Sequence, residues 1–193
     1  MTVFHFIRHG QVENPGDIYY GRLPGFPLSD EGRQSILYLG QQLAHQSHAL
    51  FSTIYTSPLL RTTQSAALLA ELLNLPVEQD NRLIEIATFF EGKAKGAASS
   101  VQHYPPEQAG YAETMAEIYQ RMATFVHDIA LLHPHQHVIA LTHGGPIRLL
   151  EMGIEGQPFT DWAYNNQPIP DYASMTLVTV DNDHLSVERA EAS

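Results

Sequence analysis

The sequence contains no cysteine, and lysine occurs at only two of its 193 positions. Without cysteine the chain has no disulfide bonds and no thiolate ligands for a metal. Lysine and arginine together contribute 10 positive charges against 21 acidic residues, which gives a formal net charge of −11. Because such a surface repels nucleic acids and anionic membranes, we expect neither as a partner.

Other signals are missing as well. No apolar run is long enough to cross a bilayer, and the N-terminus lacks the basic and apolar segments of a secretory signal. A GxxxxGK loop, which would favour a nucleoside triphosphate enzyme, is absent. Hydrophobic residues make up 44% and charged residues 16% of the chain, as in folded globular proteins. We therefore expect a single soluble, cytoplasmic domain that spans residues 1–193.

Predicted strands and helices alternate along the chain. Runs of apolar and β-branched residues predict strands, whereas apolar residues at helical spacing predict helices. The expected strands cover residues 3–7, 51–56 and 137–142, with extended pieces at 76–77 and 82–86 and an edge hairpin of 174–180 and 184–189. The expected helices cover residues 29–44, 58–73, 113–132 and 147–150, with Ser29 and Ser57 as their first caps. The alternation predicts an α/β fold, a three-layer α/β/α sandwich around a mostly parallel central sheet.

Two of the predicted strands end in a histidine. Arg8-His9-Gly10 follows the first strand, and His143-Gly144-Gly145 follows the strand at 137–142. Right-handed crossovers bring the carboxyl ends of parallel strands to one rim of the sheet, where the ligands of open α/β sheets bind. We therefore expect both histidines to lie at the same site.

The residues beside these histidines suit a phosphate. Arg8 offers a planar fork of donors that matches phosphate oxygens, and His9 offers a ring nitrogen that can attack phosphorus. Arg61 falls in the first turn of a predicted helix, where a cation is unfavourable unless an anion lies nearby. The sequence thus predicts a phosphate site at this rim.

Four motifs in this order resemble the histidine phosphatase superfamily, which includes the cofactor-dependent phosphoglycerate mutases and many small-molecule phosphatases. They are Arg8-His9-Gly10, Ser57-Pro58-Leu59-Leu60-Arg61-Thr62, Leu83-Ile84-Glu85 and Thr142-His143-Gly144-Gly145-Pro146-Ile147-Arg148. The resemblance implies a phosphoglycerate mutase-like fold and a phosphohistidine intermediate on His9. It also implies that Arg8, Arg61, His143 and the N–H group of Gly144 hold the phosphate oxygens, without a metal or a cofactor.

The resemblance leaves the proton donor open among three acidic residues. Glu85 matches the residue that protonates the leaving alkoxide and later activates water. Because the chain departs from the family pattern after Glu85, Glu91 and Glu13 are alternatives. Asn14 lies one place before the family's loop asparagine, where this chain has Pro15, and is expected among the phosphate ligands.

These observations predict a metal-independent phosphomonoesterase that acts on a small phosphorylated metabolite. One alternative is a 2,3-bisphosphoglycerate-dependent phosphoglycerate mutase. Mutases of the family carry extra basic residues in the variable insertion, here residues 87–111, which offers only Lys93 and Lys95. The other alternative is a non-catalytic, phosphate-binding regulatory module. The exposed edge at 174–189 is a candidate surface for a homodimer.

Three alternating histidines, His133, His135 and His137, invite interpretation as a metal site. Pro134 interrupts them and no acidic cluster accompanies them, so we expect solvated side chains and no metal.

Overall fold

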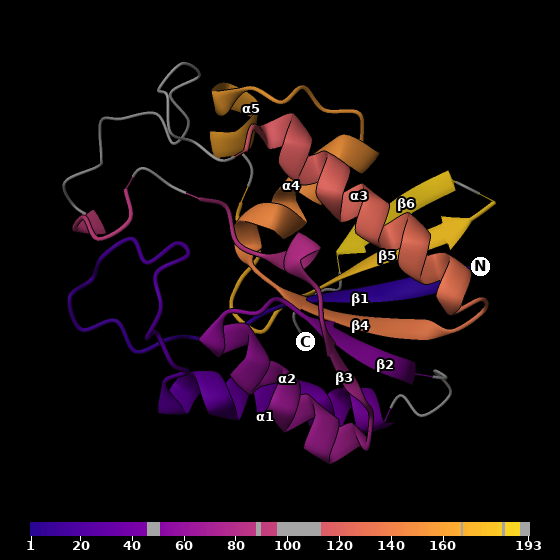
Figure 1. The fold of residues 1–193 in the computed structure, drawn as a ribbon, viewed down its shortest axis with the longest axis horizontal. Coiled ribbons are helices and arrows are strands. Elements are labelled where there is room, and N and C mark those ends of the chain that lie inside the picture. Colours follow the sequence, from indigo (N-terminus) through magenta and orange to yellow (C-terminus); the bar gives the residue numbers. More distant parts are fainter. Residues whose placement is uncertain (46–50, 88–89, 96–112, 167, 183, 190–193) are drawn as a thin grey trace.

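The computed structural model describes residues 1–45, 51–87, 90–95, 113–166, 168–182 and 184–189, and the residues between these ranges lie outside the description (Figure 1). Six strands form one sheet in the order β3-β2-β4-β1-β5-β6. They are β1 (Thr2–Arg8), β2 (Phe51–Thr56), β3 (Val77–Gln79), β4 (His137–Thr142), β5 (Met175–Asp181) and β6 (His184–Arg189). Strands β3, β2, β4 and β1 are parallel, whereas β5 and β6 pair antiparallel. The predicted α/β fold with a mostly parallel sheet is confirmed.

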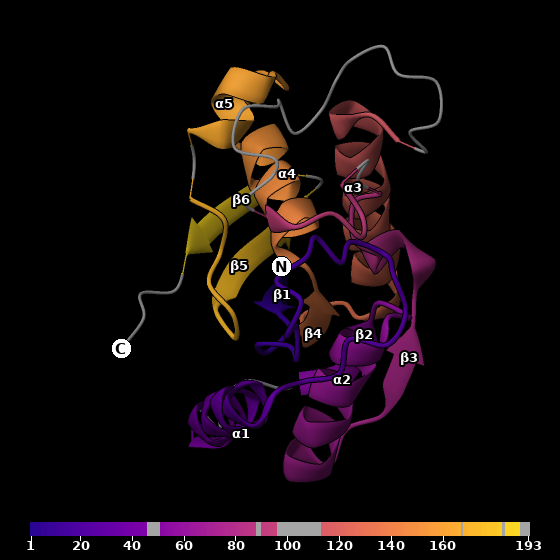
Figure 2. The same cartoon turned by 90° about the vertical axis from the view of Figure 1, so that its left-hand side faces the viewer.

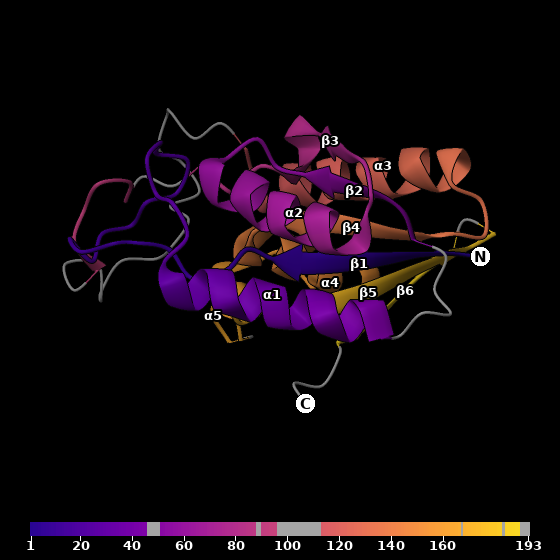
Figure 3. The same ribbon diagram turned by 90° about the horizontal axis from the view of Figure 1, so that it is seen from below.

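Helices cover both faces of this sheet (Figures 2 and 3). On one side lie α1 (Asp30–His45) and α2 (Leu60–Leu73), and on the other α3 (Met115–Leu132) and α4 (Gly144–Ile154). A short helix, α5 (Asp161–Asn165), follows α4. Because successive side chains of a strand point to opposite faces, β4 divides its apolar residues between two cores. Val138 and Ala140 pack on the side of α3, and Ile139 and Leu141 on the side of α1 and α2.

Local capping explains where most helices begin. Ser29 Oγ accepts a hydrogen bond from the N–H of Gly32 at 3.1 Å, so Ser29 caps α1 as predicted. Thr114 and Glu117 form a capping box at the start of α3, which places its first residue at Met115 rather than at Glu113. The prediction for α2 was wrong by two residues, because this helix begins at Leu60 and Leu59 occupies the cap position without a side-chain bond.

The predicted extended piece at 82–86 is also wrong. Residues Asn81–Leu83 form a single 3₁₀ turn, because the side chain of Asp80 accepts a hydrogen bond from the N–H of Arg82 at 2.8 Å. The chain from Ile84 to Ala87 then runs without regular structure. The extended piece predicted at 76–77 is present as β3, at the edge of the sheet beside β2.

The strand ends meet as expected. Arg8, the last residue of β1, pairs with Thr142, the last residue of β4, so His9 and His143 leave the sheet side by side. Beyond this rim lies the long loop of residues 11–28, drawn in indigo in Figure 1. Isolated bridges join this loop to residues 91 and 94, within the described part of the predicted insertion at 87–111. None of the helices in the described ranges combines the length and the apolar character that a membrane span requires.

Candidate active site

His9 lies at the centre of the rim, with only 1% of its surface exposed. Its Nδ1 lies 2.7 Å from the carbonyl oxygen of Gly10, and its Nε2 lies 3.1 Å from Nε of Arg61. A carbonyl only accepts and a guanidinium only donates, so Nδ1 carries the proton and Nε2 presents its lone pair. Burial, with the charges of Arg61 and Arg8, holds the pKa of His9 well below its usual value. The imidazole is therefore neutral and nucleophilic at Nε2.

Two arginines flank this imidazole. Arg61 is 1% exposed, and its Nη2 donates to the carbonyl of Gly21 at 2.7 Å. Arg8 donates from Nη1 to the carbonyl of Pro170 at 2.6 Å, while its buried Nε has no hydrogen-bond partner. A cation in the first turn of α2 opposes the helix dipole, so the position of Arg61 favours a negatively charged ligand.

His143 faces His9, and the two ring centroids lie 5.2 Å apart. Its Nε2 is 2.8 Å from Oγ of Ser57, which lies two residues before Leu59, the cap position of α2. The buried Nδ1 has no hydrogen-bond partner and lies 3.8 Å from Oε2 of Glu85. Burial is also the main reason that the pKa of His143 lies well below its usual value.

Gly144, the first residue of α4, follows His143 and lies close to Arg8. A Cβ at Gly144 would approach Nε of Arg8 to 3.3 Å and would also overlap the side chain of Ile169. Glycine therefore keeps the backbone N–H at this helix terminus accessible from the side of Arg8, as a bound anion requires.

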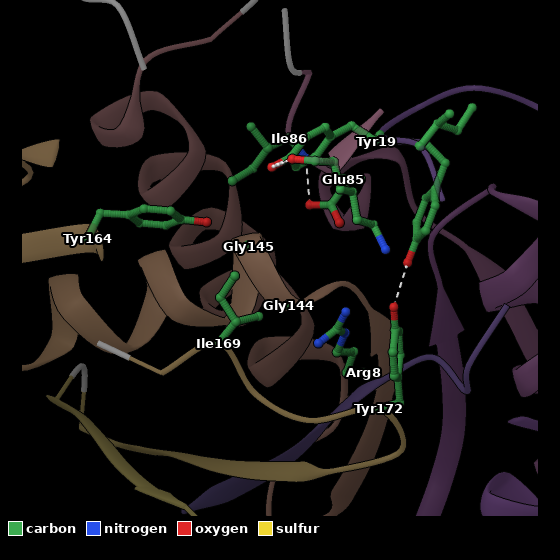
Figure 4. A pocket seen from close by; sticks show the side chains of 13 residues that line it. Arg8, Tyr19, Glu85, Ile86, Gly144, Gly145, Tyr164, Ile169 and Tyr172 are labelled. Atoms are coloured by element: carbon green, nitrogen blue, oxygen red, sulfur yellow. Dashed lines mark hydrogen bonds between the residues drawn. The ribbon is translucent and has the colours of Figure 1, made fainter. Parts of the chain in front are cut away.

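Glu85 supplies a carboxylate that lies beside His143 and lines the same cavity as Arg8, with which it is drawn in Figure 4. Its Oε1 accepts a hydrogen bond from the N–H of Ile86 at 2.8 Å. Burial raises the pKa of Glu85, and the positive charge of Arg61 opposes this only in part. A carboxyl with a raised pKa is suited to exchange protons with a substrate.

A cavity of about 280 Å³ lies beside Arg8 and Glu85, and His9, Arg61 and His143 are not among the residues that line it. Arg8, Glu85 and Gly144 contribute to its wall, and the hydroxyl of Tyr164 points into it from the opposite side (Figure 4). Isoleucine and tyrosine form most of the remaining wall, through Ile18, Tyr19, Tyr20, Ile86, Ile169 and Tyr172. The cavity thus combines a charged end with a largely apolar body.

Three of the predicted candidates lie elsewhere. Asn14 bonds to its own loop, because its amide donates to the carbonyl of Ile18 at 2.9 Å and accepts from the N–H of Ile18 at 3.2 Å. Glu13 and Asn14 line a second cavity of about 390 Å³, on the other side of Tyr20 and Tyr172. Glu91 accepts a hydrogen bond from the N–H of Arg22 at 2.7 Å. The structure brings Arg8, His9, Arg61, Glu85, His143 and Gly144 together, but not Asn14, Glu13 or Glu91.

Sequence reasoning missed two tyrosines that cover the site. The hydroxyls of Tyr20 and Tyr172 lie 3.0 Å apart and join two loops. The guanidinium of Arg61 lies 4.8 Å from the ring centroid of Tyr20, and that of Arg8 lies 3.9 Å from the ring centroid of Tyr172. For Tyr20 the sequence offers one signal, the length of its loop at 11–28, since loops this long are often functional. Tyr172 lies outside that loop.

The histidines at 133, 135 and 137 bond to different partners, and Nδ1 of His135 lies 3.3 Å from the N-terminal amine of Met1. His133 contacts the hydroxyl of Tyr55 at 3.1 Å, and His137 lies 2.8 Å from Nε2 of His5. His133 and His137 are half-buried, so the expectation of solvated side chains holds only for His135. Within the described ranges, no three residues of the metal-binding types come together.

Comparisons with known proteins identify the family to which the chain belongs. The family model "Histidine phosphatase superfamily (branch 1)" matches residues 4–193. Protein Rv0525 of Mycobacterium tuberculosis, described as uncharacterized, is 32% identical over 192 residues, which cover 95% of this chain and 93% of that protein. Phosphoserine phosphatase 1 of Hydrogenobacter thermophilus is 29% identical over 170 residues, 81% of this chain and 77% of that protein. The solved structure of Bacillus stearothermophilus YhfR superimposes with a TM-score of 0.84 at 25% identity, over 98% of this chain and 96% of that one.

Proposed function

Because the chain belongs to the histidine phosphatase superfamily (branch 1), we propose that it is a phosphomonoesterase that forms a phosphohistidine on His9 and requires no metal. Its substrate is a small phosphorylated metabolite. The positive charge that the reaction needs comes from Arg8 and Arg61, with the N–H groups of His143 and Gly144 as further donors.

One observation carries this proposal. Nε of Arg8 and Nδ1 of His143 are buried polar atoms without a hydrogen-bond partner. The ring of His143 lies 5.2 Å from that of His9, and the charge of Arg8 helps to lower the pKa of His9. A buried polar group without a hydrogen-bond partner destabilises the folded state, and native structures contain few such groups. A phosphoryl group against Nε2 of His9 would give each of them an oxygen to bond. The same placement would align the phosphorus with the nucleophile.

The reaction proceeds in two halves. In the first, Nε2 of His9 attacks phosphorus and the bond to the alcohol oxygen breaks, while protonated Glu85 donates its proton to the departing oxygen. In the second, the carboxylate of Glu85 takes a proton from water, whose oxygen attacks the phosphorus. The N–P bond then breaks, inorganic phosphate leaves and His9 regains its lone pair.

The cavity favours hydrolysis over the mutase alternative. A bisphosphate cofactor needs a second cationic cluster, yet among the described residues of the cavity wall only Arg8 and Lys95 are basic. Lys95 already pairs with Asp17, whose Oδ1 lies 3.0 Å from Nζ. The similarity to phosphoserine phosphatase 1 is consistent with hydrolysis, but it does not select a substrate for this chain.

The experiment that tests the proposal measures phosphate release from a panel of phosphomonoesters in the presence of EDTA. Wild-type protein should release phosphate, and His9→Ala should release none while keeping the far-UV circular dichroism of the wild type. Transfer of phosphate between phosphoglycerates faster than its release would support the mutase instead. Vanadate binding without release from any substrate would support the binding module.

A further inference from the structure

A side chain from a distant part of the sequence holds the backbone around Glu85 in place. Residues 84–87 follow the 3₁₀ turn and belong to no helix or strand, so no regular hydrogen-bond ladder fixes the position of Glu85. Buried or half-buried backbone groups still need partners. For the carbonyl of Glu85 that partner is Arg22, which donates from Nε at 2.6 Å.

Arg22 is itself held at two further points. Its Nη2 lies 2.5 Å from Oε2 of Glu113, and both side chains are about three-quarters buried. Its backbone N–H donates to Oε1 of Glu91 at 2.7 Å. One guanidinium therefore connects the carbonyl of Glu85 to a carboxylate just before α3, in a fork geometry that a lysine ammonium does not reproduce.

The second oxygen of Glu113 extends the connection. Oε1 of Glu113 accepts from Nε of Arg121 on α3 at 2.7 Å. Arg121 also donates from Nη1 to the carbonyl of Arg82, three residues before Glu85. Arg22 and Arg121 thus hold two carbonyls of the same irregular segment, and Glu113 lies between them.

We propose that Arg22 is a positioning residue for the proton donor, with Glu113 fixing the orientation of the Arg22 guanidinium. The inference rests on the proposed function, since it concerns the proton that Glu85 delivers. Nε and Nη2 of Arg22 are already bonded to the carbonyl of Glu85 and to the carboxylate of Glu113, so these donors hold the Glu85 segment. Figure 4 shows Glu85 opposite Arg8, where a shift of its backbone would move the carboxyl away from the leaving oxygen.

The same arrangement gives Glu91 a role. Because its carboxylate bonds to the backbone of Arg22, Glu91 stabilises the position of Arg22 and does not reach the phosphate. Arg22 also belongs to the loop that carries Tyr20, so the placement of Glu85 depends on the position of this loop.

The test compares two substrates that differ in their need for a proton. An aryl ester, p-nitrophenyl phosphate, has a good leaving group, whereas the leaving group of glycerol 3-phosphate is the alkoxide of glycerol. We expect Arg22→Lys to raise the ratio of kcat for the aryl ester to kcat for the alkyl ester by about tenfold or more, since general acid catalysis contributes typically 10²–10⁴-fold. Glu113→Gln should raise the ratio in the same direction. KM should change by less than about threefold for either ester, because neither residue touches the substrate.

Two controls make the outcome specific. Arg189→Lys alters a remote arginine–carboxylate pair, Arg189 with Glu151 at 2.7 Å, and should leave the ratio unchanged. In the Glu85→Gln background, Arg22→Lys should raise the ratio no further, because the first substitution has already removed the proton donor.

Several results would overturn the inference. An equal loss on both esters would reduce Arg22 to a structural role, and a rise in KM at constant kcat would make it a substrate ligand. If Arg22→Lys does not fold, the ratio of the two kcat values in Glu113→Gln tests the inference by itself. Wild-type protein that releases phosphate from no member of the phosphomonoester panel would instead contradict the proposed function itself.

Discussion

Nε of Arg61 donates a hydrogen bond to Nε2 of His9 over 3.1 Å, so the cation points at the lone pair that is to attack phosphorus. With Nδ1 held by the carbonyl of Gly10, the imidazole has one tautomer and one orientation. A phosphoryl group that binds to Nε2 of His9 must accept the hydrogen bond that Nε of Arg61 donates in the free protein. Arg61 then changes from a partner of the free nucleophile to a partner of the transferred oxygens.

This relationship predicts different effects for two substitutions of Arg61. Arg61→Lys keeps the charge but loses the fork that reaches His9 and Gly21 together, and kcat/KM should fall by about a hundredfold to a thousandfold. For Arg61→Gln, kcat/KM should fall at least as far. Because it also removes a charge that lowers the pKa of His9, its activity should be lost at a higher pH as the solution is acidified. A pH profile of kcat/KM checks this, with Arg33→Lys on α1 as control; equal acid limbs in both Arg61 variants would contradict it.

Glu85→Gln should discriminate between leaving groups. Turnover of an alkyl phosphate should fall by about 10²–10⁴-fold, while an aryl phosphate should lose far less, because its leaving group hardly needs a proton. In the wild type, alkyl ester turnover should decline as pH rises through the raised pKa of Glu85, and this decline should be absent from the variant. If Glu91→Gln shows this pattern and Glu85→Gln does not, the proton donor is misassigned.

Acid should destabilise the protein through His5. Burial, with the nearby His137, lowers the pKa of His5 to about 4 from 6.5. The folded state thus binds its proton less readily than the unfolded state, so stability is intact above pH 6.5 and falls as pH decreases toward 4. A shift of this size corresponds to about 3 kcal/mol at low pH.

Urea unfolding between pH 7 and pH 4 measures this effect. His5→Gln should lose less free energy of unfolding over the range than the wild type, whereas exposed His184→Gln should lose the same amount. Identical pH dependence in His5→Gln and the wild type would show that His5 does not carry the effect.

Gly10 should tolerate no side chain. A Cβ at Gly10 would overlap the carbonyl of Gly32 at the start of α1, and backbone atoms cannot rotate out of the way. Gly10→Ala should therefore lower the free energy of unfolding by about 1–3 kcal/mol. At Gly16 a Cβ would lie 3.6 Å from Cγ2 of Ile18, an ordinary contact, so Gly16→Ala is the matched control. Thermal unfolding that leaves both variants at the wild-type midpoint would contradict the prediction.

The sequence predicted the parts of the site that follow from strand ends. His9 and His143 each come directly after a buried strand, and parallel strands bring such residues to one rim. Arg61 was recognised as a cation at an unfavourable helix position. These signals are local in the chain, and the topology of the sheet then places them together.

The parts that escaped prediction depend on contacts between distant loops. Tyr20 and Tyr172 are 152 positions apart, and nothing in either loop indicates that their hydroxyls meet. The hydrogen bond between Arg22 and Glu113 joins residues 91 positions apart, and nothing in the sequence near either residue indicates it. Asn14 was expected at the phosphate by analogy with the family, but Pro15 and the turn beside it direct the amide to Ile18.

The central claim is that His9 carries the phosphoryl group, and rapid quenching tests it most directly. Protein mixed with a phosphomonoester labelled at phosphorus and quenched in base within milliseconds should retain label that is stable to alkali, labile to acid and located by mass spectrometry on His9. Label should be absent from His9→Ala and should accumulate in Glu85→Gln with an aryl ester, because water attack is then slow. Phosphate release at the wild-type rate with no label on His9 would contradict the account.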